Sequence, residues 1–376
     1  MSTGVPAGCP EQSLHPSASR GQHCGAAPAV DGNCLAHLST DRLQAYLADL
    51  APGADVDAGG VVFTADLLQH LLTAARTGDQ IELGNVDFSV ATFTEDANFS
   101  AATFTKVANF SDVTFAASAD FGRAAFTEDA DFRSATFTGD AYFRFTTFIR
   151  DVDFSGGRVE GRLELVRCAA LELVWAGARI SGELVVEAAV AWVDLSGARA
   201  SGRVGLRLRG ARVDLSEAVF TGPVTVHGLQ TAIDGVDEAA SAWEGAGPGG
   251  PAPRVKLVSL RGADAERLVL TDVDLSECGF AGMQQLEKIT LDGRCRFATD
   301  PRGRRQMLAE EHHWRAAKPR WPAGRGGLGV GRPRRTGWPW WTRRGWRCCT
   351  GSCARRWRMP RTSRARPPGR GCGPVS

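Results

Sequence analysis

The sequence predicts an all-β solenoid, in which the chain winds repeatedly around one elongated core. Three observations support this prediction. Phenylalanine recurs at alternating steps of five and six residues between 88 and 154, and a small residue stands two positions before most of these rings. A later segment repeats short motifs at intervals of twenty residues. Internal repetition at a short fixed period is the sequence signature of solenoid proteins.

The phenylalanine spacing predicts short extended segments joined by corners. Two steps make a unit of eleven residues, which a helix would cover in three turns of about 3.67 residues each. A step of five residues, however, rotates a helix by about 140°, so alternate rings would lie on different faces. An odd step along one continuous strand would also send alternate rings outward. Corners keep all the rings inside as a structural ladder of Phe88, Phe93, Phe99, Phe104, Phe110, Phe115, Phe121, Phe126, Phe132, Phe137, Phe143, Phe148 and Phe154.

The later repeats predict how many corners close one coil. Ser181-Gly182, Ser201-Gly202 and Thr221-Gly222 stand twenty residues apart along the chain. Twenty residues are four segments of five, so each coil is expected to have four sides. In the phenylalanine region two units of eleven make a coil of about twenty-two residues, with one extra residue at two of its corners.

These motifs resemble the pentapeptide repeat family. The pattern A-(D/N)-F-x-x, followed further on by A-x-V-D-L-S, is similar to the family's repeat, in a phenylalanine-rich variant. The resemblance implies a right-handed, four-sided parallel β-helix over residues 85–227, with further coils at 255–300. The motif is specific for the fold and says little about activity.

The segment before the repeats predicts two helices. Residues 40–50 and 64–75 each begin with a threonine that can cap a helix, and both carry apolar residues at helical spacing. The second helix has a stripe of leucines, namely Leu67, Leu68, Leu71 and Leu72. Because an open solenoid end exposes unpaired edges and apolar side chains, we expect residues 39–84 to form a helical N-terminal cap.

Three further segments are expected to lie outside the regular coils. Residues 1–38 are predicted to be a disordered N-terminus, and the Gly/Pro/Ala-rich residues 228–254 a flexible insertion. Residues 301–376 carry 20 basic and two acidic side chains, whereas residues 1–300 carry 24 basic and 40 acidic ones. This Trp/Arg/Pro-rich tail is interpreted as an out-of-frame translation of a GC-rich bacterial gene, as a disordered basic tail, or as a segment that binds nucleic acid.

The sequence offers no pattern typical of a metal or cofactor site. His312-His313 follow two glutamates but do not form HExxH, in which the histidines are one helical turn apart. Cys348, Cys349 and Cys353 lack a second ligand pair. The ten cysteines form no paired CxxC framework, which favours free thiols in a reducing cytoplasm. We therefore expect no cofactor, no metal and no catalytic residue.

The lack of recognisable targeting signals also favours the cytoplasm. The N-terminus lacks a basic region followed by an apolar run, so no secretory signal is expected. No run of 18 apolar residues occurs, so no membrane span is expected in the sequence as written. A cytoplasmic location follows as an expectation.

The acidic residues of the repeats suggest a contact surface. Asp87, Asp120, Asp131 and Asp153 precede phenylalanines and are expected to point outward, as a candidate acidic partner-binding face. The expected function is a non-catalytic scaffold that binds another protein, possesses no direct nucleic-acid site in its β-helix and is able to form a homodimer. Because some pentapeptide repeat proteins are similar to duplex DNA in width and charge, the alternative is a DNA-mimicking modulator of DNA gyrase. A membrane-associated protein or a β-helix enzyme is a third interpretation.

Overall fold

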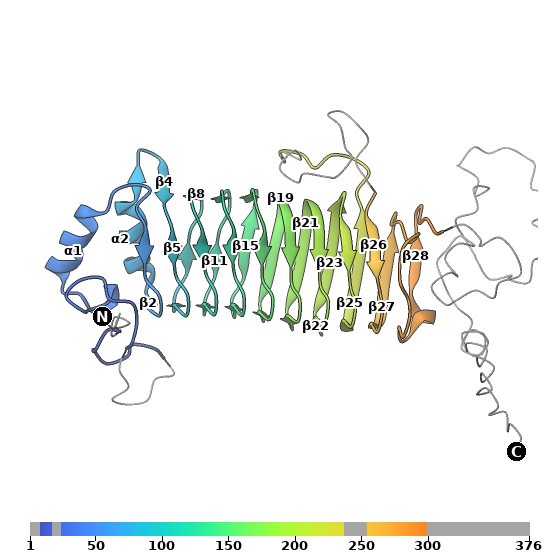
Figure 1. The fold of residues 1–376 in the computed structure, drawn as a ribbon, viewed down its shortest axis with the longest axis horizontal. Coiled ribbons are helices and arrows are strands. Elements are labelled where there is room, and N and C mark those ends of the chain that lie inside the picture. Colours follow the sequence, from blue (N-terminus) through green and yellow to red (C-terminus); the bar gives the residue numbers. More distant parts are fainter. Residues whose placement is uncertain (1–7, 17–23, 237–253, 299–376) are drawn as a thin grey trace, which may run out of the picture.

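The computed structural model describes residues 8–16, 24–236 and 254–298. It is a parallel β-solenoid of about nine turns, with helices at its N-terminal end (Figure 1). Each coil has four sides, because β5 pairs with β9 after three intervening strands. We name the sides A to D in chain order. The predicted four-sided β-solenoid is confirmed.

Most strands are very short because each is one side of a coil. Side A contains β1 (Val56–Asp57), β5 (Val86–Asp87), β9 (Ala108–Asn109), β13 (Ala130–Asp131), β17 (Val152–Asp153), β24 (Arg212–Asp214) and β26 (Lys256–Ser259). Side B contains β2 (Val62–Phe63), β6 (Thr92–Phe93), β10 (Thr114–Phe115), β14 (Thr136–Phe137), β18 (Arg158–Val159), β20 (Arg179–Ile180) and β22 (Arg199–Ala200).

The other two sides follow the same rule. Side C contains β7 (Ala97–Asn98), β11 (Ala119–Asp120), β15 (Ala141–Arg144) and β28 (Thr290–Asp292). Side D contains β4 (Gln80–Leu83), β8 (Ala102–Phe104), β12 (Ala125–Phe126) and β16 (Thr147–Phe148), and β3 (Arg76–Thr77) pairs with β4 in antiparallel fashion. Longer strands run around corners in the later coils: β19 (Arg162–Val174), β21 (Glu183–Asp194), β23 (Arg203–Arg209), β25 (Val219–Gly228) and β27 (Asp264–Thr271).

Strand register gives the coil length directly. In the phenylalanine region Thr114 pairs with Thr136, which is twenty-two positions further along the chain. Arg158 pairs with Arg179, twenty-one positions later, and Arg179 pairs with Arg199, twenty positions later. Both of the coil lengths predicted from the repeat spacing are therefore present.

The core is a continuous column of side chains inside the coils. Every phenylalanine of the ladder is at most 2% exposed. Rings one coil apart stack, as Phe110 does on Phe132 with centroids 4.8 Å apart and planes at 3°. Rings on the opposite sides A and C meet edge to face, as Phe110 and Phe121 do at 5.6 Å and 89°. Such pairs contribute about 0.5–1.5 kcal/mol beyond the area they bury. Phe154 stacks on Trp175, after which leucine and valine predominate in the core, where Phe220 and Phe280 are also buried.

The first coil begins earlier than the predicted boundary at residue 85. β1 pairs with β5, β2 with β6 and β4 with β8, and Phe63 stacks on Phe93 with centroids 5.0 Å apart. The two predicted helices are present as α1 (Thr40–Asp49) and α2 (Ala65–Ala74). The helix α2 takes the place of a side C strand, next to β7, and buries Leu68, Leu71 and Leu72. The predicted helical cap at the N-terminal end is confirmed, and α2 in addition occupies one side of the first coil.

The N-terminal segment is ordered where the structure describes it, so the predicted disorder of residues 1–38 is wrong for 8–16 and 24–38. Cys9, Ala26, Cys34 and Leu35 are buried in the same core cluster as the ladder. The 3₁₀ helix η1 (Leu35–His37) belongs to this segment.

The C-terminal part of the solenoid contains β26 to β28 and the 3₁₀ helix η3 (Leu286–Lys288), so strands of the solenoid are present after residue 255. Most of the predicted insertion, 237–253, and the tail, 301–376, lie outside the described residues. No helix in the described part of the chain is long and apolar enough to cross a membrane.

Candidate functional site

The four aspartates of the predicted acidic face do not share one face. Asp87, Asp131 and Asp153 lie on side A, where they stack through Asn109. Asp120 lies on side C, between Asn98 and Tyr142 of the neighbouring coils. The single acidic face inferred from the sequence is therefore corrected to one column of three aspartates and one separate residue.

Each of these aspartates forms a corner of the solenoid. The Oδ1 atom accepts a hydrogen bond from the backbone N–H two residues later, at Ser89, Gly122, Arg133 and Ser155, with distances of 2.7–2.9 Å. The residue after that donor is left-handed, with φ between 57° and 69°, in all four cases. Side chains of Asp and Asn favour such turns because they bond their own backbone two residues on. One oxygen of each carboxylate thus accepts a hydrogen bond that stabilises a corner of the solenoid.

A column of arginines occupies side B of the later coils. Arg158 pairs with Arg179, and Arg179 pairs with Arg199, in three consecutive coils. All three side chains are exposed, and none makes an ion pair or side-chain hydrogen bond with another described residue. They line an open groove of about 560 Å³ together with Ser181, Ser201, Thr221 and one acid, Glu160. We call Arg158, Arg179 and Arg199 the arginine column.

Other arginines, in the strands that follow side B in the same coils, form ion pairs with glutamates. Arg162 contacts Glu164 at 2.8 Å and Glu183 at 3.3 Å, and Arg207 contacts Glu187 at 2.9 Å. Arg203 lies 3.6 Å from Glu183. The arginines of the arginine column therefore differ from these arginines because no carboxylate among the described residues forms an ion pair with them.

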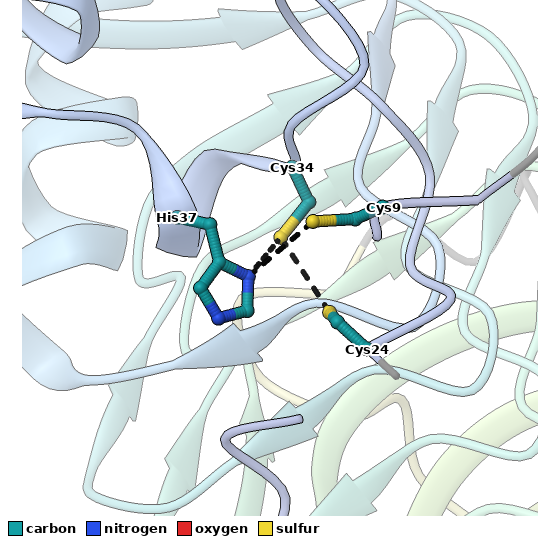
Figure 2. Close-up of side chains that lie close together, drawn as sticks. All are labelled: Cys9, Cys24, Cys34 and His37. Carbon is teal, nitrogen blue, oxygen red and sulfur yellow. Dashed lines mark hydrogen bonds between the residues drawn. The ribbon is translucent and has the colours of Figure 1, made fainter. Parts of the chain in front are cut away.

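A second unusual group lies in the N-terminal segment. The side chains of Cys9, Cys24, Cys34 and His37 converge, and their donor atoms all lie within 4.8 Å of one another (Figure 2). Nδ1 of His37 is 3.5 Å from Sγ of Cys9 and 3.2 Å from Sγ of Cys34, and the Sγ atoms of Cys24 and Cys34 are 3.7 Å apart. We call these four residues the cysteine–histidine cluster. Within the described ranges, it is the one group of side chains with the arrangement to hold a metal ion.

Burial and a neighbouring thiol raise the pKa of Cys34 in this cluster. Cys9 and Cys34 are buried, whereas Cys24 and His37 are half-buried. Burial raises the pKa of the Cys34 thiol to about 12, and the neighbouring Cys24 contributes to this rise. Without a positive charge beside it, the Cys34 thiol stays protonated at neutral pH.

Comparison with known proteins identifies the repeats. Residues 110–158 match the family described as pentapeptide repeats (9 copies), and this match lies almost entirely within the phenylalanine ladder. The chain is a pentapeptide repeat protein. No curated protein and no solved structure matches this pentapeptide repeat protein.

Neither the arginine column nor the cysteine–histidine cluster of this pentapeptide repeat protein was expected from the sequence. The three arginines are each one coil apart along the chain, so the coil length would have predicted their stacking. In the cluster, Cys34 and His37 alone have the short x₂ spacing of a zinc ligand pair. Cys9 and Cys24 join that pair only through the fold of the N-terminal segment.

Proposed function

We propose that the chain is a non-catalytic scaffold and that its arginine column binds an acidic segment of a partner protein. The observation that carries this proposal is the stacking of three exposed arginines with no acidic partner among the described residues. Neighbouring parallel strands are about 4.8 Å apart, and like charges at directly opposing positions destabilise a sheet. A bound acidic segment would remove that repulsion.

The chemistry of the groove supports an extended acidic peptide as the ligand. A guanidinium group forms two parallel hydrogen bonds to one carboxylate, and these charge-assisted bonds are stronger than neutral ones. The hydroxyls of Ser201 and Thr221 lie beside the arginines along the same groove and supply further donors. Successive coils thus offer a row of binding positions at nearly constant spacing.

A scaffold fits the role of the other polar residues better than an enzyme does. The aspartates that the sequence marked as candidates for a contact surface each use an oxygen to hold a corner. The same geometry does not favour a gyrase-binding DNA mimic, since mimicry requires carboxylates regularly placed along one face. Asn109 interrupts the side A column, and Asp120 lies on another side.

The test compares two triple variants with the same change in net charge. The first replaces Arg158, Arg179 and Arg199 with glutamine, and the matched control replaces the ion-paired Arg162, Arg203 and Arg207 with glutamine. Binding of fluorescent peptides rich in Asp and Glu is measured by anisotropy at several salt concentrations. We expect the first variant to lose about tenfold or more in affinity, equivalent to about 1.4 kcal/mol, while the control retains most of its affinity.

Two results would contradict the proposal. Equal losses in both triple variants would mean that binding follows net charge and not the column. A substrate-dependent turnover that a single carboxylate substitution abolishes would show that the protein is an enzyme.

A further inference from the structure

We propose that Cys9, Cys24, Cys34 and His37 bind one Zn²⁺ ion as a structural centre that secures the N-terminal segment to the first coil. Four donor atoms of the types that zinc prefers converge in this cluster, although Cys9 and His37 stand far apart in the sequence (Figure 2). This inference is independent of the proposed partner binding.

The distances between the donor atoms agree with tetrahedral zinc coordination. With Zn–S near 2.3 Å and Zn–N near 2.0–2.1 Å, a tetrahedron places two sulfurs about 3.8 Å apart and sulfur about 3.5 Å from nitrogen. The Sγ atoms of Cys24 and Cys34 are 3.7 Å apart, and His37 Nδ1 is 3.5 Å and 3.2 Å from the sulfurs of Cys9 and Cys34. All six distances between donor atoms are within 4.8 Å, so the side chains must move together by up to about 1 Å to enclose an ion.

The donor set selects the metal and its role. Three thiols and one imidazole suit zinc, whereas calcium and magnesium require oxygen ligands. Four protein ligands fill a tetrahedral shell and leave no position for water or substrate, which is the property of a structural site. A disulfide is a poorer explanation, because the Cys24 and Cys34 sulfurs are 3.7 Å apart against about 2.05 Å in a disulfide, and it would leave Cys9 and His37 unexplained.

The backbone holds the ligands in place through local hydrogen bonds. Cys9 N–H donates to Ala26 O at 2.9 Å, and Gly25 N–H donates to Cys9 O at 3.0 Å, so two of the ligand-bearing segments lie side by side. A tight turn at Asp31-Gly32, with φ of 49° and 84°, leads directly to Cys34. His37 N–H then donates to Cys34 O at 2.9 Å in the turn of η1.

The cluster lies where the solenoid needs a cover. Ala27 N–H donates to Gly59 O at 2.7 Å, and a Cβ on Gly60 would lie 3.2 Å from Ala26 Cα, so this segment contacts the corner after β1 directly. The segment itself is short and contributes few large apolar side chains. Chains of fewer than about 40 residues usually require a metal or disulfides to hold a stable structure. The ion would supply that stability and protect the first coil.

The experiment measures metal content in the full chain with Cys348, Cys349, Cys353 and Cys372 replaced by serine, so that no tail thiol competes. After purification under reducing conditions in zinc-containing buffer and gel filtration, we expect about one zinc per chain by elemental analysis. Substitution with Co²⁺ is expected to give the visible absorption bands of a tetrahedral cobalt–thiolate site.

Variants separate the cluster from general thiol binding. Cys34→Ser and His37→Ala are expected to lose the zinc, whereas His37→Cys, which offers a fourth thiolate, keeps it. Cys295→Ser is the matched control, because Cys295 is a half-buried thiol far along the solenoid, and it keeps the full zinc content. Chelation of the parent protein is expected to lower its melting temperature and to expose the N-terminal segment to protease, and added Zn²⁺ reverses both effects.

Three results would overturn the zinc assignment. The first is a reduced parent protein that carries no zinc and shows no cobalt–thiolate bands. The second is undiminished zinc in Cys34→Ser and His37→Ala. The third is a chelator-insensitive melting temperature with a Cys24–Cys34 disulfide found by mass spectrometry of protein alkylated without reduction.

Discussion

The phenylalanine coils and the aliphatic coils are two solutions to the same four-sided fold. The longer coils enclose the stacked rings, whereas the shorter coils, each closed two positions earlier, enclose leucine and valine. The shortening occurs in two steps. One residue is lost between sides D and A, since Thr147 pairs with Ala169 but Val152 pairs with Leu173. The second is lost in β21, which has no partner for Arg167 of β19. The coil thus shortens where aliphatic side chains replace most of the rings, although Phe220 is also buried in a twenty-residue coil.

The two regions also differ at their corners. In the phenylalanine region the left-handed residue is Val90, Ala101, Asp112, Arg123, Ser134 or Phe145. In the aliphatic region glycine takes this place at 156, 177, 197 and 262, and Glu217 is the one non-glycine residue in this series. A left-handed backbone costs a non-glycine residue about 1–2 kcal/mol, which burial of one phenylalanine, at about 1.5–3 kcal/mol, can offset. The stability gained from aromatic packing can thus offset left-handed non-glycine residues at the corners, which are less frequent in the aliphatic coils.

The largest effect is expected from a charge inside the phenylalanine coils. Phe110→Asp removes ring contacts worth about 3–5 kcal/mol and leaves a carboxylate in the core without a partner. Because domains are stable by about 5–15 kcal/mol, we expect the solenoid to unfold, as measured by circular dichroism and thermal melting. Phe145→Asp is the control, since Phe145 is an exposed corner residue, 41% accessible, and should fold normally. A fully folded Phe110→Asp protein would contradict the inward ladder.

A smaller effect is expected from an aromatic ring in the aliphatic coils. Leu206 is fully buried between Val186 and Val226 of the neighbouring coils. Leu206→Phe should destabilise the protein by about 1–3 kcal/mol through overpacking, whereas Leu206→Met should cost less than about 1.5 kcal/mol. Chemical denaturation measures both free energies of unfolding. If the phenylalanine variant were as stable as the parent, coil perimeter and side-chain size would be unrelated.

An exchange of corner residues should give effects of about 1–2 kcal/mol with opposite signs. Val90→Gly relieves a left-handed β-branched residue and is expected to stabilise the protein. Gly177→Val introduces the same strain, at a position where a Cβ meets nothing within 4 Å, and is expected to destabilise it. The difference in unfolding free energy between each variant and the parent is the measurement. Changes of the same sign in both variants would rule out corner strain as the difference between the regions.

The smallest effect concerns a carboxylate at the boundary between the regions. Burial raises the pKa of Asp151, and the neighbouring Asp129 raises it further, while Arg150 lowers it. A raised folded-state pKa means that the ionised carboxyl destabilises the fold above that pKa, and that the penalty disappears as pH falls below the unfolded-state value. Asp151→Asn should therefore be slightly more stable than the parent at neutral pH, and the gap should close in acid. Thermal melts of both proteins from neutral to acidic pH provide the test. A stability difference between them that increases in acid would contradict the raised pKa of Asp151.

The fold could be predicted from the sequence to the extent that the repeat is regular. Each step of five or six residues ends at an inward ring, so the coil length in this region follows from the spacing of Phe88 to Phe154, and the later repeats supply the number of sides. The first coil escaped prediction because Phe63 stands apart from the ladder in the sequence and a helix replaces one of the coil's sides. A single coil whose sequence does not match the next coil gives no repeat spacing that could be recognised.

The architecture follows from the amino-acid sequence, because a β-solenoid has a period of one coil and every coil repeats the same inward and outward positions. The tertiary structure alone decided which polar side chains meet. Stacking brings Arg158, Arg179 and Arg199 together across coils, and the folded N-terminal segment brings Cys9 and Cys24 to Cys34 and His37. The spacings between those cysteines follow no period, so only the hydrogen bonds and turns of the folded segment make the cluster.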